Sequence, residues 1–337
     1  MSRPTFLCYP FLLILTLFFL KVNAQDPKYP AEITVDQNGS GNYKTIQEAV
    51  NAVRDLGEKE VKIKVKNGIY KEKLIIPSWK TNITIIGEST DRTIITGNDY
   101  SGKANAGKDA FGNEKFSTYT SYSMLVQGND CHLENLTIIN ASGRVGQAVA
   151  LHVEGDRFIA KNCKFLGNQD TLYAATENSR QYYFKCFIQG TTDFIFGQAT
   201  AVFQECEIKS LSDSYVTAAA TSKNQKFGFV FLNCKLIADS SVGKVYLGRP
   251  WRPFAKTVFL NCELGKHIVE AGWNPWKGDK MFPDKEKTTY YAEYKSRGEG
   301  TSPKTRINWS KQLSDKEAKE YTLKNIFNSG DHWNPGK

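Results

Sequence analysis

The sequence predicts an all-β protein with a single domain built as a solenoid, and three observations predict this fold. An aliphatic or aromatic flank around a cysteine recurs along the chain, as "IAKNCKF", "YYFKCFI", "VFQECEI", "VFLNCKL" and "VFLNCEL". The cysteines of these segments follow one another at similar intervals, as Cys163, Cys186, Cys206, Cys234 and Cys262. Polar, glycine-containing turns separate them, and the absence of helices of comparable length argues against a doubly wound sheet. This spacing is typical of short coils that stack on one another.

Two earlier segments extend the repeat towards the N-terminus. The segment "HLENLTI" has Leu136 where the later segments have cysteine, and "KTNITII" around Ile83 is a further expected copy. A cysteine in this position should point inward, where a free thiol behaves as a small hydrophobic group, and we expect this of Cys163, Cys234 and Cys262. Neighbouring coils lie about 4.8 Å apart, so an adjacent pair such as Cys186 and Cys206 can be bridged by a disulfide. The paired spacing of zinc sites is missing, and we expect no metal.

Short helices are predicted at the two ends of the solenoid. In "TIQEAVNAV", Thr45 and Glu48 form a capping box, and the apolar residues that follow have helical spacing, so this helix can cover the first coil. The segment "SDKEAKEYTL" repeats the capping pattern with Ser314 and Glu317. The polar, glycine-rich stretch 99–117 has no period and is predicted to be a long surface loop that borders a cleft.

The N-terminus has the pattern of a signal peptide. Arg3 precedes an apolar block, Phe11 to Leu20, and small residues around Ala24 suit a signal peptidase. We therefore expect residues 1–24 to be removed and residues 25–337 to form one β-solenoid domain. The apolar block has about ten residues, too few to cross a bilayer, which needs about 20. The expected product is a secreted monomer without membrane insertion, located extracellularly, in a cell wall or in a periplasm.

The charge of the chain favours an acidic partner. The formal net charge is +9, and loss of Arg3 and Lys21 with the signal peptide would lower it by two, to +7. This excess suits a polyanion, although a basic surface without any partner remains an equally good interpretation. Nucleic acid is not expected, because export removes the usual encounter and the sequence has no compact basic recognition motif.

Two aspartates occupy equivalent places in neighbouring coils. Asp170 lies seven residues after Cys163, and Asp193 lies seven residues after Cys186. If these coils stack in register, the carboxyl groups are close, and two like charges at that distance push their pKa values apart. The apolar run Phe194 to Phe196 would supply a low-dielectric wall. Asp213 has the same spacing and would extend the column, and each aspartate can also be an ordinary turn or capping residue.

Residues near the aspartates favour chemistry over a structural role. The side-chain amides of Gln147 and Gln169 can stabilise an oxyanion, although a glutamine in a coil is commonly a ladder or surface residue. In "LGRPW", Arg249 can pair with an ionised aspartate, and Trp251 can stack on a sugar ring or simply pack. The sequence has no GxSxG or HExxH motif, and none of its four histidines has an evident nucleophile partner. A carboxylate is therefore the expected nucleophile or base.

Five segments together resemble the signature motifs of pectin methylesterases. They are "GIYKEKL", "GQAVAL", "GNQDTLY", "DFIFG" and "LGRPW", in the order of that family, and the resemblance extends from about Val35 to Trp276. Any one motif would be weak, but five in order are specific. The resemblance implies a right-handed parallel β-helix that hydrolyses the C6 methyl ester of polygalacturonate, the backbone of pectin. It also implies release of methanol without a metal or other cofactor.

The resemblance assigns roles to the polar residues. It makes Asp193 the nucleophile that attacks the ester carbonyl. It makes Asp170 the general acid for departing methanol and then the base that activates water. Gln147 and Gln169 would hold the oxyanion, and Arg249 would orient Asp193 and keep it ionised.

The resemblance also suggests aromatic and cysteine contacts. Trp251, with Tyr173 and Phe196, would bind sugar rings. Trp273 and Trp276 lie in a C-terminal segment to which the resemblance assigns no role, and we expect them at the edge of the cleft. Cys186 and Cys206 are similar in position to a disulfide pair in some bacterial members.

The sequence departs from the family in one respect, and two alternative functions remain open. Only about ten residues separate the expected cleavage site from the first coil, so the inhibitor-like pro-domain of many plant members is expected to be absent. Another β-helical pectin-degrading hydrolase or lyase would use the same scaffold and polymer, since glycosidases also use two carboxylates. A binding solenoid without catalysis is the third candidate, because a fold alone does not confer activity.

Overall fold

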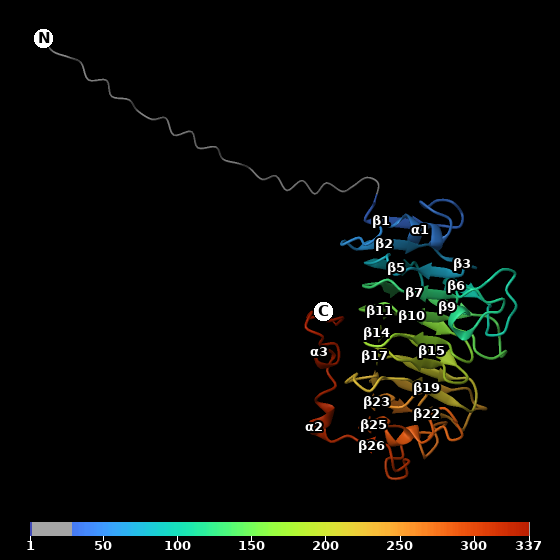
Figure 1. Cartoon of the computed structure of the whole chain (residues 1–337), viewed down its shortest axis with the longest axis vertical. Coiled ribbons are helices and arrows are strands. Elements are labelled where there is room, and N and C mark those ends of the chain that lie inside the picture. Colours follow the sequence, from blue (N-terminus) through green and yellow to red (C-terminus); the bar gives the residue numbers. More distant parts are fainter. Residues whose placement is uncertain (2–28, 337) are drawn as a thin grey trace.

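The computed structural model describes residue 1 and residues 29–336 (Figure 1). The predicted signal peptide lies, apart from residue 1, outside the described residues. In residues 29–336 the chain winds into three parallel sheets, and successive coils add one strand to each sheet in turn. Within the same residues, no helix is long and apolar enough to cross a membrane.

The three sheets form the faces of the solenoid. The eleven-stranded sheet contains β1 (Glu32–Val35), β2 (Val61–Val65), β5 (Ile83–Gly87), β8 (His132–Glu134), β11 (Phe158–Lys161), β14 (Arg180–Phe184), β17 (Thr200–Gln204), β20 (Phe229–Leu232), β23 (Lys256–Leu260), β25 (Tyr290–Tyr294) and β26 (Lys311–Gln312). The eight-stranded sheet contains β3 (Gly68–Tyr70), β6 (Thr93–Gly97), β9 (Thr137–Asn140), β12 (Lys164–Leu166), β15 (Phe187–Gly190), β18 (Glu207–Ser210), β21 (Lys235–Ala238) and β24 (Glu263–Leu264). The seven-stranded sheet contains β4 (Leu74–Ile76), β7 (Met124–Val126), β10 (Leu151–Val153), β13 (Leu172–Ala174), β16 (Ile195–Gly197), β19 (Tyr215–Ala219) and β22 (Tyr246–Gly248).

The predicted cysteine column is present in the core. Strand register places Leu136, Cys163, Cys186, Cys206, Cys234 and Cys262 one above another, each just before a strand of the eight-stranded sheet. The residue before each member of this column has a φ of 52–54°, which makes the tight bend out of the eleven-stranded sheet. The segment around Ile83 is not a copy of this position, because β5 pairs with β8 in the eleven-stranded sheet.

The expected disulfide between Cys186 and Cys206 is not formed. In residues 29–336 the six cysteines are buried free thiols. The Sγ of Cys186 lies 3.5 Å from the carbonyl oxygen of Ala160, and the Sγ of Cys206 lies 3.4 Å from that of Tyr183. Each thiol therefore donates to the backbone of the preceding coil instead of bonding to the neighbouring sulfur.

Aromatic rings stack along the interior in the same way. The ring centroids of Tyr183 and Phe203 are 4.8 Å apart, those of Phe203 and Phe231 are 4.6 Å apart, and those of Phe231 and Phe259 are 4.2 Å apart. All four side chains are fully buried. Because equivalent positions repeat in every coil, the core is a set of columns in which each ring contacts the next.

The N-terminal helix is formed as predicted. Helix α1 (Ile46–Ala52) has the capping box of Thr45 and Glu48, and Ile46, Ala49 and Val50 are buried against the first coil. The carboxylate of Glu72 accepts hydrogen bonds from the backbone N–H groups of Ile46 and Gln47, at 3.0 and 2.9 Å. These contacts satisfy N–H groups that a helix start leaves without partners.

The predicted C-terminal helix also forms, with a second helix after it, but it does not lie at the end of the stack as expected. Helix α2 (Asp315–Ala318) has the predicted capping box, and α3 (Leu323–Ile326) follows it. Both run back along the outside of the eleven-stranded sheet (Figure 1). Leu313, Ile326 and Phe327 pack there on the outward-facing residues Ile159, Tyr182, Val202, Val230 and Val258. This tail is therefore a strap across several coils, because it carries its own apolar face to the flank of the sheet.

An ion-pair cluster holds the end of this strap. The guanidinium of Arg180 donates to the carbonyl oxygen of Phe327 at 3.1 Å and to both carboxylate oxygens of Asp331 at 2.7 and 2.6 Å. The same guanidinium also donates to the carboxylate of Asp156, so three acceptor groups surround one largely buried cation.

Candidate active site

The strand register brings Asp170 and Asp193 together. Lys164 pairs with Phe187 in one flanking sheet, and Leu172 pairs with Ile195 in the other. In both pairings the two partner residues are separated by the same number of positions in the sequence. This separation equals that between Asp170 and Asp193, so the predicted stacking of these acids on adjacent coils is confirmed. Both residues have positive φ, 66° and 48°, at the turn between the eight-stranded and the seven-stranded sheets. Aspartate tolerates this conformation better than most residues.

Asp213 does not extend the column. In the next coil Phe187 pairs with Glu207 in the eight-stranded sheet, whereas Ile195 pairs with Thr217 in the seven-stranded sheet. The turn between these two strands is therefore two residues longer than in the coil before. The insertion places Tyr215 opposite Asp193, whose N–H donates to the Tyr215 carbonyl at 2.9 Å. Asp213 is exposed and accepts hydrogen bonds from the backbone of a surface turn.

Arg249 fixes the carboxyl group of Asp193. Its Nε and Nη2 donate to the two carboxylate oxygens at 3.0 and 2.6 Å, which is a bidentate ion pair. The guanidinium carbon lies 3.9 Å from the ring centroid of Tyr215 and 3.6 Å from that of Trp276. Two aromatic rings therefore hold the arginine in place while it presents its donors to Asp193.

Burial and neighbouring charges give the carboxyl groups of Asp170 and Asp193 different pKa values. Burial raises the pKa of Asp193, and Arg249 opposes this shift by stabilising the anion. For Asp170, burial raises the pKa well above its usual value, and the neighbouring Asp193 charge raises it further. The carboxyl group of Asp170 receives no hydrogen bond from any residue that the structure describes. The pair is therefore suited to hold one anion, on Asp193, and one proton, on Asp170.

The acids open into a cleft of about 380 Å³. The predicted residues that line it are Gln147, Gln169, Asp170, Asp193, Phe196, Arg249 and Trp251. Gln147 and Gln169 pair as neighbours on consecutive coils, through a parallel bridge. Their amide groups make no side-chain hydrogen bonds within residues 29–336, so both are free to meet a group bound in the cleft.

The aromatic predictions hold only in part. Phe196, Trp251 and Trp276 line the cleft. Tyr173 lies beneath it, buried, with its ring stacked on Phe196 at 4.5 Å and 6°. Trp273 is 1% exposed and packs in the core against Phe259 and Tyr291, so the expectation that it edges the cleft is wrong.

The structure adds residues that the sequence did not single out. Tyr119, in the short helix η1 (Thr118–Thr120) after the long loop, forms one wall, so this loop does lead into the cleft as expected. Arg252 lies over the ring of Trp251, 4.5 Å from its centroid. Its position next to the "LGRPW" motif was the only available signal, whereas Tyr119 had none.

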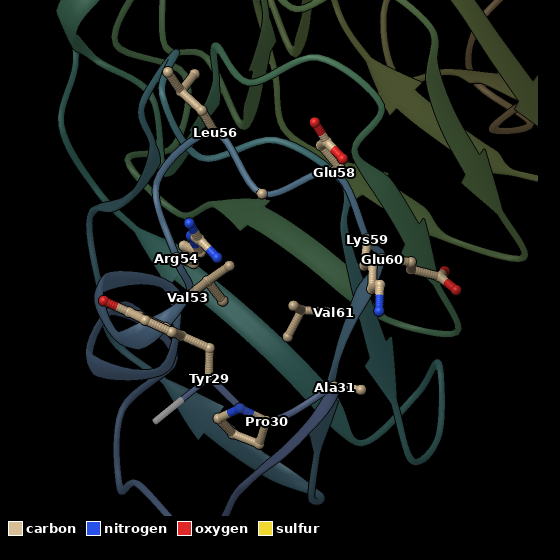
Figure 2. A pocket seen from close by; sticks show the side chains of 11 residues that line it. Tyr29, Pro30, Ala31, Val53, Arg54, Leu56, Glu58, Lys59, Glu60 and Val61 are labelled. Atoms are coloured by element: carbon tan, nitrogen blue, oxygen red, sulfur yellow. The ribbon is translucent and has the colours of Figure 1, made fainter. Parts of the chain in front are cut away.

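A second hollow lies at the N-terminal end of the stack (Figure 2). It measures about 420 Å³ and lies between the residues after α1 and the start of β1. Its acidic residues, Glu58 and Glu60, are exposed side chains in a surface turn, and Arg54 and Lys59 are exposed as well. Although this hollow is larger, it has no buried carboxyl group and no paired acids, so the chemistry belongs to the other cleft. Within the described chain, no group of three or more His, Cys, Asp or Glu side chains is arranged to hold a metal ion.

Fold and site together define a class of protein: a right-handed parallel β-helix with a paired-carboxylate site on its outer face. The pectinesterase family profile matches residues 32–331, and the chain belongs to this family.

Relatives and solved structures agree with this assignment. The chain is 38% identical over 328 residues to an Arabidopsis thaliana protein named probable pectinesterase/pectinesterase inhibitor 64, covering 90% of this chain and 52% of that protein. It thus spans about half the length of this curated relative. A pectin methylesterase from carrot has a TM-score of 0.79 and 32% identity, covering 88% of this chain and 92% of that one. A pectin methylesterase in complex with a hexasaccharide has a TM-score of 0.74 and 30% identity, covering 90% and 97%.

Proposed function

We propose that this protein is a pectin methylesterase that hydrolyses the C6 methyl ester of polygalacturonate to methanol and pectate. The observation that carries the proposal is the stacked pair of Asp170 and Asp193, in which Arg249 pairs with Asp193 only and in which the pKa of Asp170 is the one raised well above its usual value. A related protein of similar fold has been solved with a hexasaccharide, which supports a saccharide chain as the ligand of this cleft.

The first half of the proposed reaction forms an acyl-enzyme. An oxygen of the Asp193 carboxylate attacks the ester carbonyl carbon, and the carbonyl oxygen becomes an oxyanion. The amide NH2 groups of Gln147 and Gln169 donate hydrogen bonds to this oxyanion. The tetrahedral intermediate collapses, the bond to the methoxy oxygen breaks, and Asp170 donates its proton so that methanol leaves.

The second half restores the enzyme. Asp170, now a carboxylate, takes a proton from water, and the resulting hydroxide attacks the galacturonyl carbonyl of the anhydride. The bond to Asp193 breaks, its carboxylate returns to Arg249, and Asp170 again carries a proton. The sum is one ester and one water converted to one carboxylic acid and one methanol. Both acids regain their starting protonation states, as a pair with separated pKa values allows.

Aromatic and basic side chains give the cleft its affinity for the polymer. Phe196 and Trp251 present ring faces on which sugar rings can stack. Arg252 adds a positive charge beside Trp251, which suits uronate groups that have already lost their methyl ester. Tyr173 supports Phe196 from below and acts through it.

Two features of the wider chain belong to the same proposal. Residues 1–24 are removed as a signal peptide and residues 25–337 form the catalytic domain, which acts as a secreted monomer outside the cell. N-terminal sequencing of the secreted protein tests the cleavage site, and its mass in solution tests the monomer.

The test of the activity is methanol release from highly methylated pectin, with uronate chain length followed in parallel. Wild type should release methanol without shortening the polymer. Asp193→Asn should lose at least about 10³-fold in kcat, the scale expected when a nucleophile is removed. Asp213→Asn is the matched control, because this aspartate is exposed and out of register, and it should keep full activity.

Other outcomes would redirect the assignment. Methanol release by Asp193→Asn would refute its role as the nucleophile. Shortened or unsaturated chains would indicate a hydrolase or a lyase, and binding of pectin without any reaction would indicate a binding solenoid.

A further inference from the structure

Lys285 is a buried lysine in the segment between Trp276 and β25. Its side chain is 0% exposed, although the segment around it carries exposed residues such as Lys280 and Met281. Burying an ammonium group is costly unless it is paired and hydrogen-bonded. A lysine in this position of an irregular surface segment therefore calls for specific contacts.

Those contacts tie the segment to the cleft. The Nζ of Lys285 donates to the carboxylate of Asp279 at 2.6 Å and to the carbonyl oxygen of Trp251 at 3.2 Å. It also lies 4.3 Å from the ring centroid of Trp276. Asp279 in turn accepts hydrogen bonds from the backbone of Met281 at 3.0 Å and Phe282 at 3.3 Å. The segment is thus folded around one ammonium group.

A continuous set of contacts leads from this ammonium group to the proposed nucleophile. Trp276, in contact with Lys285, lies on the guanidinium of Arg249 at 3.6 Å, and Arg249 forms the bidentate pair with Asp193. Trp251, whose carbonyl Lys285 holds, is on the wall of the same cleft. One side chain therefore holds two aromatic walls, one of which is the ring that supports Arg249.

Four elements bring titratable groups towards Asp193. Arg249 follows β22 and lowers the pKa of Asp193, and Lys285, in the short helix η2 (Lys285–Lys287), lowers it as well. Asp170 lies on the preceding coil, where its own pKa is raised well above normal, so it faces Asp193 as a neutral acid. The phenol of Tyr291 in β25 is fully buried and its pKa is raised, so it is neutral too. Lys285 and Arg249 thus contact the same Trp276 ring, which brings a second cation next to the group that pairs with Asp193.

We propose that Lys285 is a positioning residue of this site, which holds the Trp251 and Trp276 walls in place and supplies a second positive charge to Asp193. The inference rests on the proposed function for its catalytic meaning. The charge of Lys285 on Asp193 can nevertheless be measured without any turnover.

The experiment is a pH titration of the Asp193 carboxyl by ¹³C NMR in aspartate-labelled protein. The Asp193 signal is assigned by its loss in Asp193→Asn. Lys285→Met keeps the length of the side chain and removes the charge, so the Asp193 midpoint should move to higher pH. Lys285→Arg should restore it. Lys287→Met is the matched control in the same helix, because its ammonium is 70% exposed, and it should leave the midpoint unchanged.

Asp279→Asn separates the charge from the fold of the segment. This variant disturbs the same hydrogen bonds but keeps the lysine side chain. Removing the compensating anion should move the Asp193 midpoint to lower pH, opposite to Lys285→Met. If Lys285→Met does not fold, the direction of the Asp279→Asn shift decides. An upward shift or no shift would overturn the inference.

Kinetics then connect the charge to the reaction. With methanol release as the assay, Lys285→Met should lose about three- to tenfold in kcat/KM on the acidic limb, the scale of one partly screened unit charge, and less near neutral pH. An equal loss at every pH, with an unmoved NMR midpoint, would assign Lys285 a structural role only. Failure of wild type to release methanol would refute the proposed function, while the NMR midpoints would still decide the inference about Lys285.

Discussion

Replacing Arg249 by methionine tests the ion pair on which the assignment of Asp193 depends. The substitution keeps an unbranched side chain between the rings of Tyr215 and Trp276, but it removes both hydrogen bonds to Asp193, at 3.0 and 2.6 Å. Asp193 is 6% exposed, so water cannot replace these donors fully. The anion would then be buried without a partner, and the carboxyl group would take up a proton instead.

The size of the effect follows from the two lost bonds. Hydrogen bonds to charged groups contribute about 1.5–3 kcal/mol each, so the pair stabilises the anion by about 3–6 kcal/mol. At about 1.36 kcal/mol per tenfold, kcat/KM on the acidic limb should fall about 10²- to 10⁴-fold, and by less as the pH approaches the new pKa of Asp193. Because the loss arises from protonation of Asp193, activity should recover in part as the pH is raised. The recovery should end where Asp170 loses its proton.

The assay is methanol release from methylated pectin as a function of pH. Arg249→Met should move the acidic limb of kcat/KM to higher pH and leave the alkaline limb in place. Arg297→Met is a suitable control, because this arginine is 68% exposed and pairs with Glu263 away from the cleft. An acidic limb that does not move, or a loss below about threefold on that limb, would refute the argument that Arg249 keeps Asp193 ionised.

Two further predictions concern stability. Asp170 has a raised pKa in the fold, so its contribution to stability is fully present below the pKa of the unfolded chain, about 3.9, and is lost as the pH rises through the folded value. Asp170→Asn should therefore abolish methanol release and raise Tm at neutral pH, with no gain below about pH 4; a Tm gain that is equal at all pH values would contradict this linkage. Phe231 is fully buried between Phe203 and Phe259, so Phe231→Ala should cost about 3–5 kcal/mol in guanidinium unfolding. Phe111→Ala, at a side chain that is 71% exposed, should change little, and equal losses in the two variants would show that the ring column does not carry the core.

The fold could be predicted because each coil repeats one local requirement. Successive strands of the eight-stranded sheet are each preceded by a residue in the left-handed conformation and then by a small apolar side chain. This two-residue bend explains why cysteine recurs along the sequence. The position of the C-terminal strap could not be predicted, because capping boxes define where helices begin and not what they pack on. The buried free thiols of Cys163, Cys234 and Cys262 were predicted correctly. Those of Cys186 and Cys206 could not be predicted, because a coil spacing that allows a disulfide does not direct the sulfur atoms towards each other.

The position of the site residues could be predicted from the sequence wherever neighbouring coils keep the same strand register. Asp170 and Asp193 share one offset in both flanking sheets, so counting from cysteines placed them correctly. The same count failed for Asp213. The turn that precedes the next strand of the seven-stranded sheet is two residues longer in this coil, and it lies after the strand that follows the cysteine, so the cysteine spacing does not reveal it. Lys285 lies in a segment without period or motif, and only the folded segment shows where its ammonium group lies. Tyr173 and Phe196 are direct neighbours across two strands, so sequence could not tell which ring lies uppermost.

The C-terminal strap has a mechanical consequence for a molecule of this shape. A stack in which each coil contacts only its neighbours can open from either end, one coil at a time, since the loss of a terminal coil leaves the remaining contacts intact. Here the last residues lie on side chains of β11, β14, β17, β20 and β23, and Arg180 of β14 holds Asp331 near the very end. The terminal coils of the C-terminal half cannot peel away without first detaching a segment anchored several coils earlier. The strap therefore couples coils that would otherwise open one at a time, so the C-terminal half should unfold as a single cooperative unit.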